Sequence, residues 1–218
     1  MITDVRLGDT QAIKMYRGED VVWERQSEPE LPAGYTRCKY IELSGTQSSD
    51  SPILFNNSTK YAIDCNIRET GDYQAFFDAL IVNSWPRLYS FIIPSGILNV
   101  AENSTGLRFP FGNRVSISYS FANSSSVSVN SYTYAFDRSP YYNREVSLFG
   151  RRGLAIGLSG FVYGVMLGND GEIREYIPAY SYELNSAGLL CISNGFFIKS
   201  AVGKFGYELM DGTYVAPI

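Results

Sequence analysis

The most informative absence in this chain of 218 residues is histidine, which does not occur at all. Without histidine, Ser-His-Asp and Cys-His catalysis, His-Glu-x-x-His metal sites and histidine acid–base chemistry are excluded. That removes most hydrolases. Two neighbouring carboxylates, Glu172 and Glu175, are three residues apart in an expected strand, and this odd spacing places them on opposite faces instead of together as a glycosidase pair. The sequence therefore predicts a protein that is not an enzyme.

Cysteine, charge and long apolar runs are also scarce. The three cysteines, Cys38, Cys65 and Cys191, stand far apart without a Cys-x-x-Cys pair, which excludes the usual zinc spacing and predicts buried free thiols. Charged residues make up 18% of the chain, and the formal net charge of −4 argues against nucleic acid and anionic membranes as partners. No run approaches the roughly 20 apolar residues that span a bilayer. The first residues lack the basic and apolar regions of a secretory signal, so we expect synthesis in a cytoplasm.

No cofactor is expected, and no metal site is assigned. Four aspartates leave a calcium ligand open as an alternative, although no Asp-x-Asp-x-Asp-Gly loop is present: Asp50, Asp64, Asp78 and Asp170.

Strand-forming residues, in contrast, are abundant, with 17 Tyr, 13 Phe and 45% hydrophobic residues. Residues 115–121 alternate, so that Val115, Ile117, Tyr119 and Phe121 face one way and three serines the other; residues 61–67 alternate in the same manner. Only Tyr73–Leu80 has a mildly helical pattern. Further strands are expected over 88–93, 97–101, 127–136, 146–149 and 154–158, with turn residues between some of them. About a dozen short strands indicate an all-β fold of two packed antiparallel sheets or a barrel.

Two hairpins are expected near the C-terminal end. Phe161–Leu167 and Ile173–Ile177 flank a glycine-bearing loop of four residues, 168–171. Leu189–Ile192 and Phe196–Lys199 flank Ser-Asn-Gly, in which Asn-Gly supplies the positive φ angles of a tight turn.

The N-terminal segment contains a ten-residue repeat, in which residues 5–13 align with residues 15–23 and each copy reads as strand, Gly-acidic turn, strand. Three parts are expected: a β-hairpin adaptor over 1–25, a stiff Pro- and Glu-bearing linker over 26–34 and the main domain over 35–218. The repeat is interpreted either as a flap on the main domain or as an attachment and oligomerisation segment. In the second interpretation the apolar residues of the repeat form the interface: Val5, Leu7, Ile13, Met15, Val21 and Trp23.

The opening of the main domain, Leu-Pro-Ala-Gly-Tyr-Thr at 31–36 followed by Tyr-Ile-Glu-Leu-Ser-Gly-Thr-Gln at 40–47, resembles laminin-G-like (concanavalin A-like) jelly-roll domains common in phage tail and other virion proteins. The resemblance covers residues 31–206. It departs from the family pattern after Gln47, where Ser-Ser-Asp-Ser replaces an aromatic continuation. The C-terminal matches are 149–151, 169–171, 174–178, 188–190, 194–197 and 203–205.

This resemblance implies a jelly-roll sandwich in a virion structural or appendage protein, such as a tail fibre, a head fibre or a decoration protein, assembled in the bacterial host cytoplasm. Other virion proteins are the implied partners, together with further copies of the chain, with a trimer favoured. Sugar recognition needs aromatic faces and a few placed polar groups, and one part of the chain has that mixture: Tyr132, Tyr134, Tyr141, Tyr142 and Arg144. We therefore expect binding to a host-surface glycan; the alternative is a purely structural decoration or oligomerisation module without a ligand.

Overall fold

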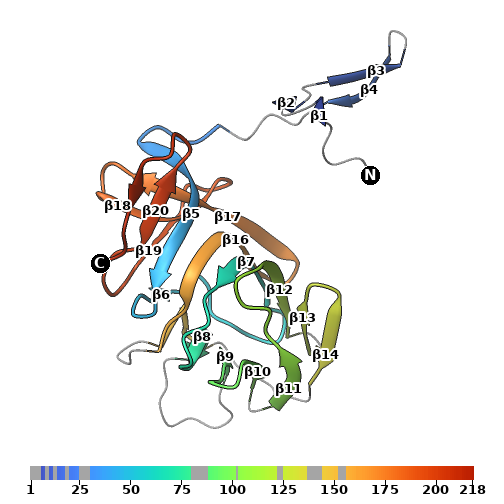
Figure 1. Ribbon diagram of the computed structural model, residues 1–218, viewed down its shortest axis with the longest axis vertical. Coiled ribbons are helices and arrows are strands. Elements are labelled where there is room, and N and C mark those ends of the chain that lie inside the picture. Colours follow the sequence, from blue (N-terminus) through green and yellow to red (C-terminus); the bar gives the residue numbers. More distant parts are fainter. Residues whose placement is uncertain are drawn as a thin grey trace. The chain divides into compact units, whose positions relative to one another are not determined.

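The computed structural model describes residues 30–79, 88–101, 103–121, 125–136, 144–151 and 156–218, together with the backbone of four short strands before residue 25. The chain divides into two units, Met1–Glu30 and Leu31–Ile218, which are described separately. The described residues contain no helix, and so none of the length and apolar character needed to cross a membrane. All regular structure in them is β (Figure 1).

The first unit consists of two antiparallel hairpins, as the repeat predicted. β1 (Arg6–Leu7) pairs with β2 (Thr10–Gln11), and β3 (Lys14–Arg17) pairs with β4 (Asp20–Glu24). Of the six residues expected at an interface, Val5 and Ile13 lie outside the described residues, whereas the others lie in strands: Leu7 in β1, Met15 in β3, and Val21 and Trp23 in β4. Their role at an interface stays a prediction.

The second unit contains a six-stranded antiparallel sheet. Its strands, in spatial order, are β11 (Asn103–Arg108), β10 (Ile97–Val100), β9 (Tyr89–Ile92), β8 (Gln74–Ala79), β15 (Val146–Leu148) and β6 (Ser49–Asp50).

The other sheet has eleven strands and is also antiparallel. It runs from β14 (Tyr132–Ala135) through β13 (Ser126–Val129), β12 (Arg114–Ser120), β7 (Lys60–Ile67), β16 (Ser159–Asn169), β17 (Glu172–Ser181), β5 (Tyr35–Ser44) and β20 (Gly206–Leu209) to β21 (Tyr214–Val215). β18 (Ser186–Cys191) pairs with β17 and carries β19 (Phe197–Lys199). The long β16 pairs with β5 near its start and with β7 along most of its length (Figure 1). The prediction of an all-β, two-sheet antiparallel sandwich is confirmed; its jelly-roll strand order stays a prediction.

The alternating strand β12 faces the core as predicted. Val115, Ile117, Tyr119 and Phe121 are at most 3% exposed, whereas the serines between them lie on the outer face. The ring of Tyr119 lies 5.1 Å from that of Phe77 in the six-stranded sheet, so aromatic contacts join the two sheets. The three cysteines are free and buried, as predicted, and burial raises the pKa of the Cys38 thiol to about 12.

Three turns differ from the expectations. In the β18–β19 hairpin the innermost pair is Leu190 and Phe197, and of Asn194 and Gly195 only Gly195 has a positive φ, of 72°. In the β16–β17 hairpin Asn169 pairs with Glu172, so only Asp170 and Gly171 form the loop, at φ 51° and 87°. This is a two-residue turn with two left-handed positions, tighter than the expected loop of four. The single strand expected over 127–136 is instead the β13–β14 hairpin, turned at Asn130 with φ 52°, a conformation that asparagine tolerates. Of the strand expected over 154–158, residues 154 and 155 lie outside the described residues, and the rest forms only an isolated bridge, between Gly157 and Gly150.

Within the segment with the mildly helical pattern, residues 74–79 form strand β8 instead. Ala75 pairs with Phe91 and Phe77 pairs with Ser90, which leaves Phe76 as an extra residue in a β-bulge. Because of the bulge, both phenylalanines point into the core. The rings of Phe76 and Phe77 lie 6.5 Å and 5.1 Å from that of Tyr119. The apolar spacing looked helical because it contains two successive phenylalanines. A strand can bury both only through a bulge, which places them on one face.

We predict opposite outcomes for aspartate at two neighbouring positions of β12. Ile117→Asp places an unpaired charge between the sheets and is expected to cost more than about 4 kcal/mol, enough to unfold the domain. Ser118→Asp, on the outer face, is expected to change stability by less than about 1 kcal/mol. Thermal melting followed by circular dichroism measures both, and a cooperative, wild-type-like melt of Ile117→Asp would contradict the assignment of faces.

Candidate ligand-binding site

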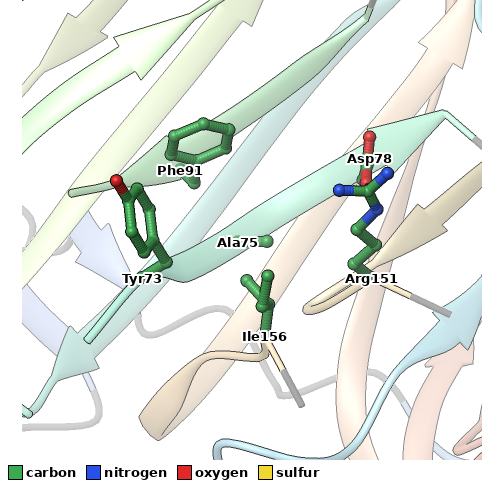
Figure 2. A pocket seen from close by; sticks show the side chains of 6 residues that line it. All are labelled: Tyr73, Ala75, Asp78, Phe91, Arg151 and Ile156. Atoms are coloured by element: carbon green, nitrogen blue, oxygen red, sulfur yellow. The ribbon is translucent and has the colours of Figure 1, made fainter. Parts of the chain in front are cut away.

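A hollow of about 190 Å³ lies on the outer face of the six-stranded sheet, where β8 and β9 meet the segment that follows β15. We call it the β8–β9 hollow. Figure 2 shows Ala75 at its centre, with aromatic rings at one end and an ion pair at the other. Its lining residues are Tyr73, Ala75, Asp78, Phe91, Arg151 and Ile156.

The bulge in β8 determines which residues line this hollow. In an unbroken strand Ala75 and Asp78, three residues apart, would point to opposite faces. The extra residue at Phe76 restores a common face, so that Ala75 lies opposite Phe91 and Asp78 lies opposite Tyr89. The short side chain of Ala75 lies at the base of the hollow and is itself 1% exposed. The bulge in β8 therefore determines both which residues enter the core and which residues line the hollow.

The segment after β15 contributes the cation and an apolar wall. The Arg151 N–H donates to the Ile156 carbonyl at 2.8 Å, which holds the two residues opposite each other. The Arg151 Nε lies 2.8 Å from the Asp78 Oδ2, and the side chains remain 31% and 16% exposed, respectively. The ion pair is therefore partly buried but still reaches solvent, where a ligand can approach it.

Two rings form a corner at the other end of the hollow. The rings of Tyr73 and Phe91 lie 5.6 Å apart at 76°, and Tyr73 is 49% exposed. Tyr89, two residues from Phe91 along β9, stacks on the Phe91 ring at 4.6 Å and helps to fix its orientation. This corner offers apolar ring surface to a ligand, while Asp78 and Arg151 offer a hydrogen-bond acceptor and donors.

A larger hollow, about 490 Å³, lies on the outer face of the eleven-stranded sheet. Its floor is made of the outward serines of β12 with Ala62 and Ser126, and Lys60, Met166 and Ile173 border it. Tyr61 and Tyr119 also line it, but their side chains are buried in the core at 1% and 2% exposure. Among the described residues that line it, this serine trough therefore presents no aromatic face for stacking.

A third surface, on β5 and β16, carries aromatic rings whose faces are already occupied. The guanidinium of Arg68 lies 4.6 Å from the centre of the Phe161 ring, and that of Arg114 lies 4.1 Å from that of Tyr163. The Tyr40 hydroxyl donates to Glu208 at 2.6 Å, and burial, followed by this hydrogen bond, raises the pKa of Tyr40. The rings, guanidinium groups and hydroxyl on this surface are thus already engaged with one another, and their contacts stabilise the sheet.

The residues expected from the sequence to bind sugar are not among those that line the β8–β9 hollow. Tyr134 packs against the core, whereas Tyr132, on the same strand, is 71% exposed. Arg144 forms a backbone bridge with Phe55, through hydrogen bonds of 2.8 Å in both directions. Tyr141 and Tyr142 lie outside the described residues. A glycan site at these residues stays a prediction.

Acidic side chains do not gather into a metal site within the part of the chain that the structure describes: no three His, Cys, Asp or Glu residues there are placed to hold an ion. Two of the four aspartates considered for calcium are instead paired with arginines, Asp64 with Arg114 and Asp78 with Arg151.

Comparison with known proteins returns no match for this chain, either among protein-family models or among curated proteins.

The β8–β9 hollow was not predicted from the sequence, because it is formed by three segments that are distant in the chain. One local signal was present: Phe76-Phe77, a pair of successive large apolar residues inside an otherwise strand-like stretch. Such a pair breaks the period of two and can mark a bulge, which often lies next to a functional site.

We predict that the two sides of β8 contribute unequally to stability. Phe76→Ala removes a fully buried ring and is expected to cost about 3–5 kcal/mol. Tyr73→Ala removes a half-exposed ring at the rim and is expected to cost less than about 1.5 kcal/mol. Urea unfolding of the full chain measures both free energies. Equal losses would show that the bulge does not direct Phe76 into the core.

Proposed function

We propose that this chain is a non-enzymatic appendage protein of a bacteriophage virion whose sandwich attaches to a glycan on the bacterial surface. The observation that carries the proposal is the β8–β9 hollow, in which a corner of aromatic rings faces an ion pair across the small residue Ala75. Sugars combine an apolar face of C–H groups with hydroxyls, and sites that bind them combine aromatic surface with a few placed polar groups. The hollow has both.

The virion setting is supported by the sequence alone. The Leu-Pro-Ala-Gly-Tyr opening and the C-terminal hairpins resemble domains of phage tail and other virion proteins, and the N-terminal repeat resembles β segments that begin phage structural proteins. In this proposal the two N-terminal hairpins mediate attachment to other virion proteins and assembly of a homo-oligomer, with a trimer favoured. The sandwich is then the part that meets the host.

A glycan array probed with the full-length protein tests the proposal. We expect binding to one or more glycans, and we expect Tyr73→Ala and Phe91→Ala each to weaken it by about tenfold or more, since aromatic anchors dominate binding energy. The melting temperature of Tyr73→Ala should change little, because its ring is half exposed. Tyr182→Ala, at an exposed tyrosine outside the hollow, is the matched control and should bind like the wild type.

Tyr132→Ala decides between the two candidate surfaces. Tyr132 belongs to the site expected from the sequence and is not part of the β8–β9 hollow. Loss of binding in Tyr132→Ala, with normal binding in Tyr73→Ala, would move the site to the residues expected from the sequence, on β14 and at 141–144. Absence of binding to any glycan would favour the alternative, a structural decoration module without a ligand.

A further inference from the structure

The β8–β9 hollow also restricts which sugars fit it. We infer that it accepts a single uncharged hexopyranose residue through two adjacent hydroxyls, as found at a chain end or branch, and that it disfavours acidic sugars; this inference rests on the glycan-binding function proposed above. The size of the hollow, its charge and its hydrogen-bonding capacity each limit the ligand.

The size of the hollow limits the ligand to one ring. Its volume of about 190 Å³ is below the roughly 300–1,000 Å³ typical of pockets for drug-sized ligands. Figure 2 shows side chains on several sides of Ala75, with Phe91 and Tyr73 on one side, Ile156 on another and the ion pair opposite the rings. A ring inserted here meets side chains in several directions, which suits a terminal or branching residue better than the interior of an extended chain.

Charge excludes the acidic sugars. The six described residues that line the hollow include one carboxylate and one guanidinium, and these neutralise each other through the 2.8 Å contact between Asp78 and Arg151. The carboxylate of a uronic or sialic acid would approach Arg151 only beside the like charge of Asp78, and like charges in contact oppose binding. An ammonium group would meet the same difficulty beside Arg151. An uncharged sugar avoids both repulsions.

The ion pair is also suited to two neighbouring hydroxyls. An ionised carboxylate only accepts hydrogen bonds and a guanidinium only donates them, whereas a sugar hydroxyl does both. One hydroxyl can therefore donate to Asp78 while its neighbour on the ring accepts from Arg151. A carboxylate has acceptor capacity for several hydrogen bonds, so Asp78 can serve the sugar while it remains paired with Arg151. The apolar face of the ring then lies toward Tyr73 and Phe91.

Matched pairs of small sugars test the inference on the full-length protein. The probes are the methyl glycosides of glucose, galactose and mannose and the methyl glycosides of the corresponding uronic acids, which keep the ring and the neighbouring hydroxyls and add one negative charge. Saturation-transfer NMR and calorimetric titration measure binding. We expect each uronic acid to bind at least about tenfold more weakly than its neutral partner.

Two variants connect this preference to the hollow. Asp78→Asn keeps the shape of the side chain and removes the negative charge, leaving Arg151 unneutralised, so the preference should shift by about tenfold or more toward the uronic acids. Ala75→Met fills the centre of the hollow and should abolish binding of both sugar classes. Thermal melting checks that each variant is folded, and if Ala75→Met does not fold, Tyr73→Ala takes its place.

The outcomes separate the inference from the proposed function. Preference of the wild type for uronic acids, with binding lost in the filled variant, would overturn the inference and leave glycan binding at the hollow in place. An unchanged preference in a folded Asp78→Asn variant would also overturn it. Sugar binding that is unaffected by both Ala75→Met and Tyr73→Ala would place the site elsewhere and overturn the inference. If no sugar binds and the glycan array is also blank, the proposed function itself fails.

Discussion

The packing of Phe76 and Phe77 against the opposite sheet is the constraint on which the candidate site depends. Both rings approach Tyr119, and Phe77 also lies 5.7 Å from Tyr61 and 5.5 Å from Phe55. Successive residues of a regular strand cannot share a face, so burial of both rings requires an extra residue in β8. Full burial of a phenylalanine is worth about 1.5–3 kcal/mol, which offsets the loss of regular pairing at the bulge. The same irregularity turns Ala75 and Asp78 outward together.

Hydrogen bonds outside the hollow connect the six-stranded sheet to other parts of the sandwich. The buried Gln74, next to Ala75 in β8, donates to the Arg68 carbonyl at 2.8 Å and accepts from the Ser159 N–H at 2.9 Å, and so links the six-stranded sheet to the start of β16. Next to the edge strand β6 of the same sheet, the Ala201 N–H donates to the Ser48 carbonyl at 2.6 Å. The bonds of Gln74 fix β8 beside Ala75, and within the hollow Phe91 stacks on Tyr89 while Asp78 pairs with Arg151. Such preorganisation favours affinity because little ordering is left for the binding step.

Much of the fold could be predicted from the sequence, because alternation is a local property. The period of two in residues 115–121 identified the core face of β12, and Asp170-Gly171 and Asn194-Gly195 marked hairpin turns. The bulge in β8 and the turn at Asn130 were missed, since each interrupts a periodic pattern with a single residue. The β8–β9 hollow was missed for another reason: Asp78, Phe91 and Arg151 are brought together by sheet pairing, which no local pattern encodes. Of the tyrosines expected to bind sugar, Tyr134 packs against the core and Tyr132 is exposed. An aromatic residue in a strand fits the core as well as a ligand surface, so composition alone does not separate the two.

The most direct test of this account is a set of nuclear Overhauser contacts across β8 in the labelled full-length protein. The account predicts contacts from the Phe76 ring to Phe109 and from the Phe77 ring to Tyr119, together with a contact between the Asp78 and Arg151 side chains. Contacts from the Phe76 ring to Tyr73 or Phe91 on the outer face, without any to Phe109, would show that β8 is regular and would contradict both the core packing and the hollow derived from it.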